Sequence, residues 1–146
     1  MVVDRHGLPL AVTISGSNVH DSKQLEATVD AIVPLRLPGR SRGRPRKRPT
    51  KLHADKGYDY PRCRRVLRSR GIIPRIARRG IESRERLGRY RWVVARTLSW
   101  LNRFRRLKVR YERRADIHRA FVTLGCALIC ARSLSQATPR CEPDSL

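Results

Sequence analysis

The sequence is short of acidic residues, aromatic residues and long apolar runs. Asp and Glu account for 12 of its 146 residues, against 34 Lys and Arg, so the formal net charge is +22. Such an imbalance argues against a housekeeping enzyme of neutral substrates. Apolar residues make up 40% of the chain, which is enough for a folded core. The composition therefore predicts a folded domain with a polyanionic partner, either nucleic acid or an anionic membrane.

Neither a membrane span nor a signal peptide is evident in the sequence. The longest apolar run, residues 120–131, is shorter than the roughly 20 residues that a bilayer requires. The first residues lack a charged segment followed by an apolar stretch. We therefore expect no membrane partner and a cytoplasmic, nucleoid-associated protein. In that reducing compartment, the four cysteines are expected to be free thiols rather than a disulfide framework.

Turn residues and apolar spacing predict alternating strands and helices in the first half of the chain. A hairpin of residues 2–3 and 8–14 is expected to turn at Gly7. Asp21 and Gln24 form a capping-box pattern at the start of a helix of about three turns. Further on, we expect a strand over 52–55, a helix from Pro61 closed by Gly71, and an edge strand over 72–77.

Helical spacing dominates the second half. After a linker over 78–88, one helix is expected to bury Val94, Leu98 and Leu101. A second helix is marked by Ile117, Phe121, Leu124 and Leu128, and residues 135–146 read as a disordered tail.

This order of elements predicts an α/β or mixed α+β domain over residues 1–134, with a mixed sheet and flanking helices. The first hairpin strand has only two apolar residues after Met1, whereas the second is much longer. We therefore expect the fold to be incomplete, with its N-terminal strand missing from this chain.

Asp55 is the best-placed candidate for a catalytic acid. It ends a short apolar strand, and the nearby Gly57 allows a close approach of backbone and substrate. Phosphodiester chemistry commonly uses two metal ions held by several carboxylates. Asp55 could equally be an ordinary cap or ion-pair partner at a strand end. Asp4 and Asp59 are better explained as a turn residue and as the cap of the helix from Pro61.

Two basic segments are candidates for contact with nucleic acid. Residues 40–51, within an expected loop over 38–51, hold seven Lys or Arg among twelve residues, and residues 78–114 hold 14 against three Glu. Arginine can contact a phosphate with two N–H groups at once. Both segments therefore predict binding to the DNA backbone without sequence recognition. The candidate DNA-binding residues are Arg42, Arg44, Arg46, Lys47, Arg48, Arg91, Arg96, Arg103, Arg105 and Arg106.

Several motifs occur in an order that resembles one known family. They are His-Ala-Asp-Lys-Gly-Tyr-Asp at 53–59, Arg-Trp-Val-Val at 91–94, Trp-Leu-Asn-Arg-Phe-Arg-Arg-Leu at 100–107 and Glu-Arg-Arg-Ala-Asp-Ile-His at 112–118. Together they are similar to the C-terminal part of bacterial insertion-sequence transposases of the DDE class. The resemblance implies a ribonuclease-H-like catalytic domain that uses three acids and two magnesium ions to cut and join DNA at transposon ends. It also implies a homodimer as a candidate assembly.

The resemblance assigns Asp55 to the second acid and to metal binding. In the family, the first acid lies upstream of the hairpin, in a region that this chain does not contain. The third acid is a glutamate in a Trp-Val-Val-Glu-Arg-Thr stretch, and Ala95 occupies that position here. Alanine offers no metal ligand, although it favours the helix. The resemblance therefore implies a truncated, inactive transposase that still binds DNA but should not hold two magnesium ions tightly.

Two alternatives remain open. In one, the first codon is internal and a longer product exists, which an acid-bearing strand upstream in frame would support. The other follows from the residues alone. A non-enzymatic basic protein that binds RNA or DNA structurally would show the same basic loops. In that case, Asp55 would be an ordinary surface acid.

Overall fold

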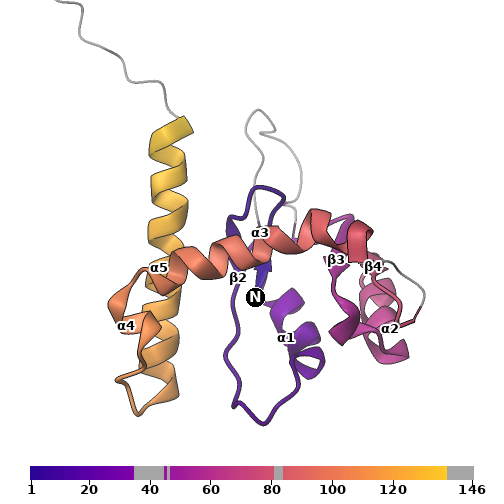
Figure 1. Ribbon diagram of the computed structural model, residues 1–146, viewed down its shortest axis with the longest axis horizontal. Helices are drawn as coiled ribbons and strands as arrows, with labels where there is room; N and C mark the ends of the chain where they lie inside the picture. Colours follow the sequence, from indigo (N-terminus) through magenta and orange to yellow (C-terminus); the bar gives the residue numbers. More distant parts are fainter. Residues whose placement is uncertain (35–44, 46, 81–83, 138–146) are drawn as a thin grey trace, which may run out of the picture.

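The computed structural model describes residues 1–34, 45, 47–80 and 84–137, without the side chains of residues 84–91 and 137. Its elements are β1 (Val2–Val3), β2 (Pro9–Ala11), the 3₁₀ helix η1 (Asp21–Gln24), α1 (Leu25–Asp30), β3 (Lys51–Ala54), the 3₁₀ helix η2 (Lys56–Tyr58), α2 (Pro61–Ser69), β4 (Ile73–Ile76), α3 (Arg84–Asn102), α4 (Arg105–Lys108) and α5 (Ala115–Ala137). Figure 1 shows α3 crossing the molecule from the β3–β4 pair to α4 and α5. This mixture of helices and short strands agrees with the predicted fold class.

The N-terminal hairpin forms as predicted. Val2 lies opposite Ala11 in the antiparallel β1–β2 pair, and Gly7 adopts a positive φ of 87° in the turn. The Oδ1 atom of Asp4 closes the turn by accepting the N–H of Leu8 at 2.7 Å. β2 ends at Ala11 rather than at residue 14, because the chain then turns toward α1, where the Thr13 and Thr28 hydroxyls lie 2.6 Å apart.

The predicted single mixed sheet is wrong for the described residues. β3 and β4 form a separate parallel pair in which Leu52 lies opposite Pro74, and this pair shares no strand with the hairpin. Pro74 has no N–H to donate, which suits a strand with one free edge. The helix α2 connects β3 to β4, as the order of elements predicted.

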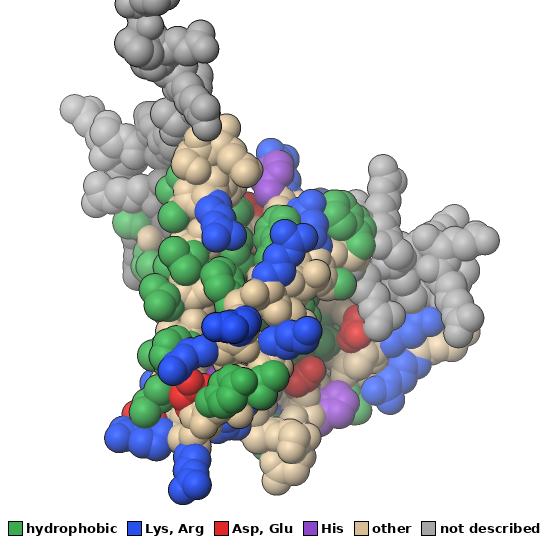
Figure 2. All heavy atoms as spheres, turned by 60° about the vertical axis from the view of Figure 1, so that its left-hand side comes forward, with side chains coloured by type: hydrophobic (Ala, Val, Ile, Leu, Met, Phe, Trp, Pro, Cys, Tyr) green, Lys and Arg blue, Asp and Glu red, His purple; other side chains and the backbone are tan. Residues whose placement is uncertain are grey.

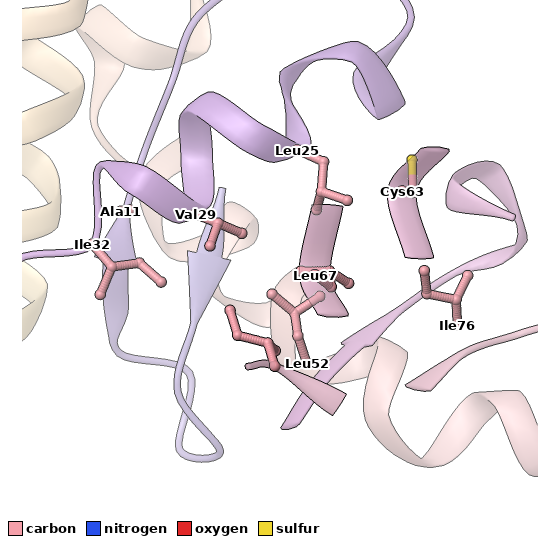
Figure 3. Close-up of a cluster of buried hydrophobic side chains, with 9 residues drawn as sticks. Ala11, Leu25, Val29, Ile32, Leu52, Cys63, Leu67 and Ile76 are labelled. Carbon is pink, nitrogen blue, oxygen red and sulfur yellow. The ribbon is translucent and has the colours of Figure 1, made fainter. Parts of the chain in front are cut away.

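Side-chain packing joins the two sheets in place of backbone pairing. One buried cluster draws on the hairpin, α1, α2 and the β3–β4 pair (Figure 3). Leu67 of α2 is completely buried within it. The cluster consists of Ala11, Leu25, Val29, Ile32, Leu52, Cys63, Leu67, Ile72 and Ile76.

An arginine at the end of α2 holds this helix against α1. The Nη2 atom of Arg70 lies 2.7 Å from Glu26 and 2.6 Å from Asp30, and its Nε donates to Asp30 at 2.8 Å. The hydrogen bonds from Arg70 hold the pKa of the Asp30 carboxyl below its usual value. Gly71 follows with a φ of 70°, which confirms the predicted end of the helix.

Two predicted helix caps are wrong. The ring nitrogen Nδ1 of His20 accepts the N–H of Ser22 at the start of η1, so Asp21 does not form the predicted capping box. At α2 the cap position is occupied by Tyr60, without a side-chain hydrogen bond, and not by Asp59. Asp59 instead bonds arginines, as described below.

The buried face of α3 differs from the predicted face. α3 begins at Arg84, inside the predicted linker, and it buries Val93, Thr97 and Leu101. Leu98, which was predicted to be buried, remains 47% exposed. In this orientation the buried hydroxyl of Thr97 donates to the carbonyl of Gly7 at 2.6 Å, while Val93 and Leu101 are buried on the same face.

α5 also presents a different face from the predicted one. It packs through Cys126 and Ile129 in a second cluster with Leu101, while Leu124 and Leu128 face outward. Gly125 lies at this crossing, and a Cβ there would lie 3.0 Å from Leu101 Cδ2 and from Leu107 Cδ1, so both leucine side chains would have to shift. The helix ends at Ala137, so residues 135–137 are helical and not part of a tail, while residues 138–146 lie outside the described residues.

The sequence predicted that no segment is long enough to span a membrane, and the length of one helix contradicts this prediction. Within the described part of the chain, one helix has the length and composition to do so, over Ala115–Gln136. Length and composition alone do not place a helix in a membrane, because core helices of other proteins meet the same criteria. Figure 2 shows apolar and cationic side chains side by side on the face that carries α5.

The hydrogen bond between α3 and the hairpin provides a test of the fold. Replacing Thr97 by Val should lower the free energy of unfolding by about 1–3 kcal/mol, because the buried Gly7 carbonyl would lose its donor. Chemical denaturation measures this change, and Thr97→Ser, which keeps the hydroxyl, is the matched control. A Thr97→Val protein as stable as wild type would contradict the role of this hydrogen bond.

Candidate functional site

Asp55 lies where the sequence places it, directly after β3. Its Oδ1 accepts the N–H of Gly57 at 2.8 Å, so the carboxylate caps η2. A Cβ on Gly57 would lie 3.0 Å from that oxygen, and the glycine therefore leaves room for the carboxylate. The side chain is partly exposed. Its second oxygen has no hydrogen bond to a described residue and remains available to a ligand.

The tyrosine that follows Asp55 in η2 feels the charge of two acids. Burial raises the pKa of the Tyr58 phenol, and the nearby carboxylates of Asp21 and Asp55 raise it further. The pKa of His53, on β3, is lowered by partial burial and then by Arg75 and Lys51. Asp21 was predicted to be a helix cap, and the effect of its carboxylate on Tyr58 was not foreseen.

The residues present do not fit a two-magnesium centre. Among the described side chains, no three of the types His, Cys, Asp and Glu come together as metal ligands would. One oxygen of Asp55 is already engaged by Gly57. Ala95, at the position that the resemblance gives to the third acid, is exposed and offers only a methyl group. We therefore derive no reaction step through a metal.

Asp59 organises a group of arginines beside Asp55. Its Oδ1 lies 2.6 Å from Arg64 Nη2, and its Oδ2 accepts the backbone N–H of Arg79 at 3.0 Å. The hydrogen bond from Arg64 and then that from Arg79 lower the pKa of the Asp59 carboxyl. The carboxylate thus connects α2 with the segment that follows β4.

The candidate DNA-binding residues of the basic loop are only partly described. Arg42, Arg44 and Arg46 lie outside the described residues. Lys47 and Arg48 are exposed, and Arg48 donates to the Arg70 carbonyl at 3.3 Å near the end of α2.

The candidates on α3 and α4 differ in their freedom to contact a ligand. The side chain of Arg91 is not among those that the structure describes. The guanidinium of Arg96 lies 4.4 Å from the ring centre of Trp92 and 4.9 Å from that of Trp100, and it donates to the His6 carbonyl. These contacts hold it within the molecule.

The remaining candidates lie around α4. Arg106 pairs with Glu112 at 3.2 Å and lies over the ring of Phe121. Arg103 and Arg105 are exposed, and neither side chain has an ion pair within the described part of the chain. Among the candidate DNA-binding residues of α3 and α4, Arg103 and Arg105 are therefore the most accessible to a ligand.

Sequence reasoning missed the arginines of α2 altogether. They are interrupted by Cys63, Val66 and Leu67, so they do not form a run of charge along the chain. The helical period places Arg64, Arg65 and Arg68 on one side. Counting cations by helix face would have found them.

The chain matches the family described as "Transposase DDE domain" over residues 1–130. It belongs to this family of DDE transposases. The geometry above had placed the motif acid at a strand end, as the resemblance implies.

A curated relative agrees with this assignment. The chain is 53% identical over 137 residues to the Burkholderia cepacia protein named "Putative transposase for insertion sequence element IS402". The match covers 94% of this chain and 64% of the relative, so the chain spans less than two thirds of that protein's length. No solved structure matches the chain significantly.

The Asp59 contacts predict a dependence of stability on pH. The ordinary pKa of an Asp carboxyl is about 3.9, and the pKa of Asp59 is lower in the folded protein. Asp59 therefore stabilises the fold fully above about pH 4, and this contribution disappears as the pH falls through the lowered pKa. Asp59→Asn should lower the melting temperature at pH 7, and the difference from wild type should shrink below pH 4.

Thermal unfolding followed by circular dichroism from pH 3 to 7 measures this effect. Arg64→Gln is the matched partner variant, and adding it to Asp59→Asn should cost less than it does in wild type. A gap between wild type and Asp59→Asn that stays constant down to pH 3 would refute the assignment.

Proposed function

We propose that this chain binds DNA as a member of the DDE transposase family but does not itself carry out metal-dependent cleavage. The role that the resemblance implies for the family is magnesium-dependent cleavage and strand transfer at transposon ends. The same proposal places the protein in the cytoplasm, on the nucleoid, and gives it a homodimeric assembly. The observation that carries it is Ala95, which stands on an exposed position of α3 where a metal-binding glutamate is expected.

The charge balance at Asp55 supports the absence of cleavage. Two divalent ions bring four positive charges, and carboxylates must oppose them. Of the two family acids that fall within this chain, Asp55 keeps its carboxylate, whereas position 95 has lost it. The nearest acid in the chain, Asp59, is already engaged by Arg64 and Arg79.

The distribution of charge supports DNA binding. Arg103 and Arg105 extend from the α3–α4 connection with no acid of the described chain paired to them. A solvated charged surface is the usual fate of isolated cations, but a net charge of +22 attracts a polyanion from a distance. Membership of the transposase family favours DNA as that polyanion.

Metal uptake tests the first half of the proposal. Titration calorimetry with magnesium or manganese should show no saturable binding to the purified protein. Ala95→Glu should also fail to nick supercoiled plasmid in the presence of magnesium, because two carboxylates still oppose two divalent ions. This substitution lies on an exposed helix position, so the melting temperature should stay close to that of wild type. Saturable uptake by wild type, or nicking by the single variant, would overturn the proposal.

Salt dependence tests the second half. If about six phosphates are contacted, affinity for a DNA duplex should fall about a thousandfold between 50 and 200 mM salt. Fluorescence anisotropy with two duplexes of unrelated sequence measures this fall, and the two should behave alike. Binding that is insensitive to salt, or no binding at 50 mM, would rule out the proposed contact with the backbone.

A further inference from the structure

An open hollow of about 770 Å³ lies between α2 and the segment that follows β4. Its lining is strongly basic. Arg78 and Arg79 begin the basic segment 78–114 that the sequence predicts to contact DNA, whereas the arginines of α2 belong to no predicted DNA-binding segment. Five guanidinium groups surround it, together with one carboxylate. The charged lining residues are Arg64, Arg65, Arg68, Arg78, Arg79 and Asp59.

Two of the five arginines are held in place. Arg64 Nη2 donates to Asp59 at 2.6 Å and to the Ile76 carbonyl at 3.1 Å. Arg79 donates from Nε to the Lys56 carbonyl at 3.2 Å, and its guanidinium lies 5.0 Å from the ring centre of Tyr60. These contacts fix both guanidinium groups without covering the hollow.

The other three arginines are not held by an ion pair or a ring contact to a described residue. Arg65, Arg68 and Arg78 are exposed, and none forms an ion pair with a described residue. The single carboxylate of the hollow, Asp59, is already used by Arg64 and Arg79. Like charges one helical turn apart, such as Arg64 and Arg68, repel each other. The hollow therefore carries an excess of positive charge that a bound anion would relieve.

We propose that this hollow binds phosphodiester groups of the DNA backbone, at a surface separate from the cations of α3 and α4. The inference rests on the proposed DNA binding and assigns part of it to α2. Guanidinium groups contact phosphate oxygens in pairs. An open hollow suits an extended polyanion better than a small molecule, which is normally enclosed. Asp55 and Asp59 lie at opposite ends of η2, so phosphates held here would bring the duplex beside the strand-end acid.

A charge-matched pair of variants tests the proposal. The hollow variant combines Arg65→Gln, Arg68→Gln and Arg78→Gln. The control variant combines Lys23→Gln, Arg119→Gln and Arg132→Gln, which removes the same charge from three exposed positions outside the hollow. Both proteins should melt close to the wild-type temperature, because each substituted side chain is exposed and forms no ion pair with a described residue. Anisotropy with a DNA duplex then gives the affinity of each protein as a function of salt.

Removing three phosphate contacts should reduce the salt dependence in the hollow variant only. At a slope of about 0.9 per phosphate, its loss of affinity between 50 and 200 mM salt should be about 40-fold smaller than that of wild type. The control variant should stay close to wild type. In wild type, bound duplex should also protect Arg65, Arg68 and Arg78 from modification by phenylglyoxal, as read by mass spectrometry.

Different failures have different meanings. If wild type does not bind the duplex, the proposed function fails together with this inference. If wild type binds and both variants lose salt dependence equally, the effect is one of net charge and the hollow is not the site. If the hollow variant loses binding to a polyglutamate peptide but keeps the wild-type salt dependence on DNA, the hollow takes acidic protein segments and the inference is overturned.

Discussion

The close contact of α3 with the hairpin turn is the constraint on which the rest of the fold depends. The hydroxyl of Thr97 is fully buried against the carbonyl of Gly7. The turn can come this close because residue 7 has no side chain: a Cβ there would lie 2.9 Å from Arg96 Nη2 and 3.1 Å from Thr97 Oγ1. The positive φ of Gly7 serves the same turn.

This contact places the hairpin between two apolar clusters. Ala11 faces the cluster of α1, α2 and the β3–β4 pair, while Leu8 and Val12 pack on the cluster of α3 and α5. The hairpin thus packs against apolar residues on both sides, although it is short. The C-terminal helices rest partly on the hairpin, because α5 makes its main contacts with α3, α4 and β2.

Local features of the fold could be predicted from the sequence. The hairpin turn at Gly7 and the end of α2 before Gly71 follow from glycine's access to positive φ. The buried faces of α3 and α5 could not be predicted, because they are decided by distant partners. In the sequence, Thr97 is indistinguishable from a surface residue, and its burial depends on the Gly7 carbonyl opposite it. The close approach at Gly125 likewise depends on Leu101, which lies far from it in the sequence. The pairing of strands into two sheets likewise depends on contacts between residues far apart in sequence.

The candidate site was predictable to a similar extent. The position of Asp55 at a strand end follows from its motif, and the structure places it there. The role of Asp59 was missed, because a cap and an arginine partner look the same in a sequence. The arginines of α2 were missed because they form no run of charge along the chain, and their proximity to Arg78 and Arg79 arises only when β4 returns beside the helix.

The high positive charge also affects how molecules of this protein meet one another. The two sheets, of two strands each, have outer backbone edges with no strand partner among the described residues, and Leu124 and Leu128 lie exposed on α5. Open edges and apolar faces promote self-association. Mutual repulsion at +22 opposes it, and added salt screens this repulsion. The same increase in ionic strength that releases a polyanion from the protein therefore also weakens the repulsion that opposes self-association.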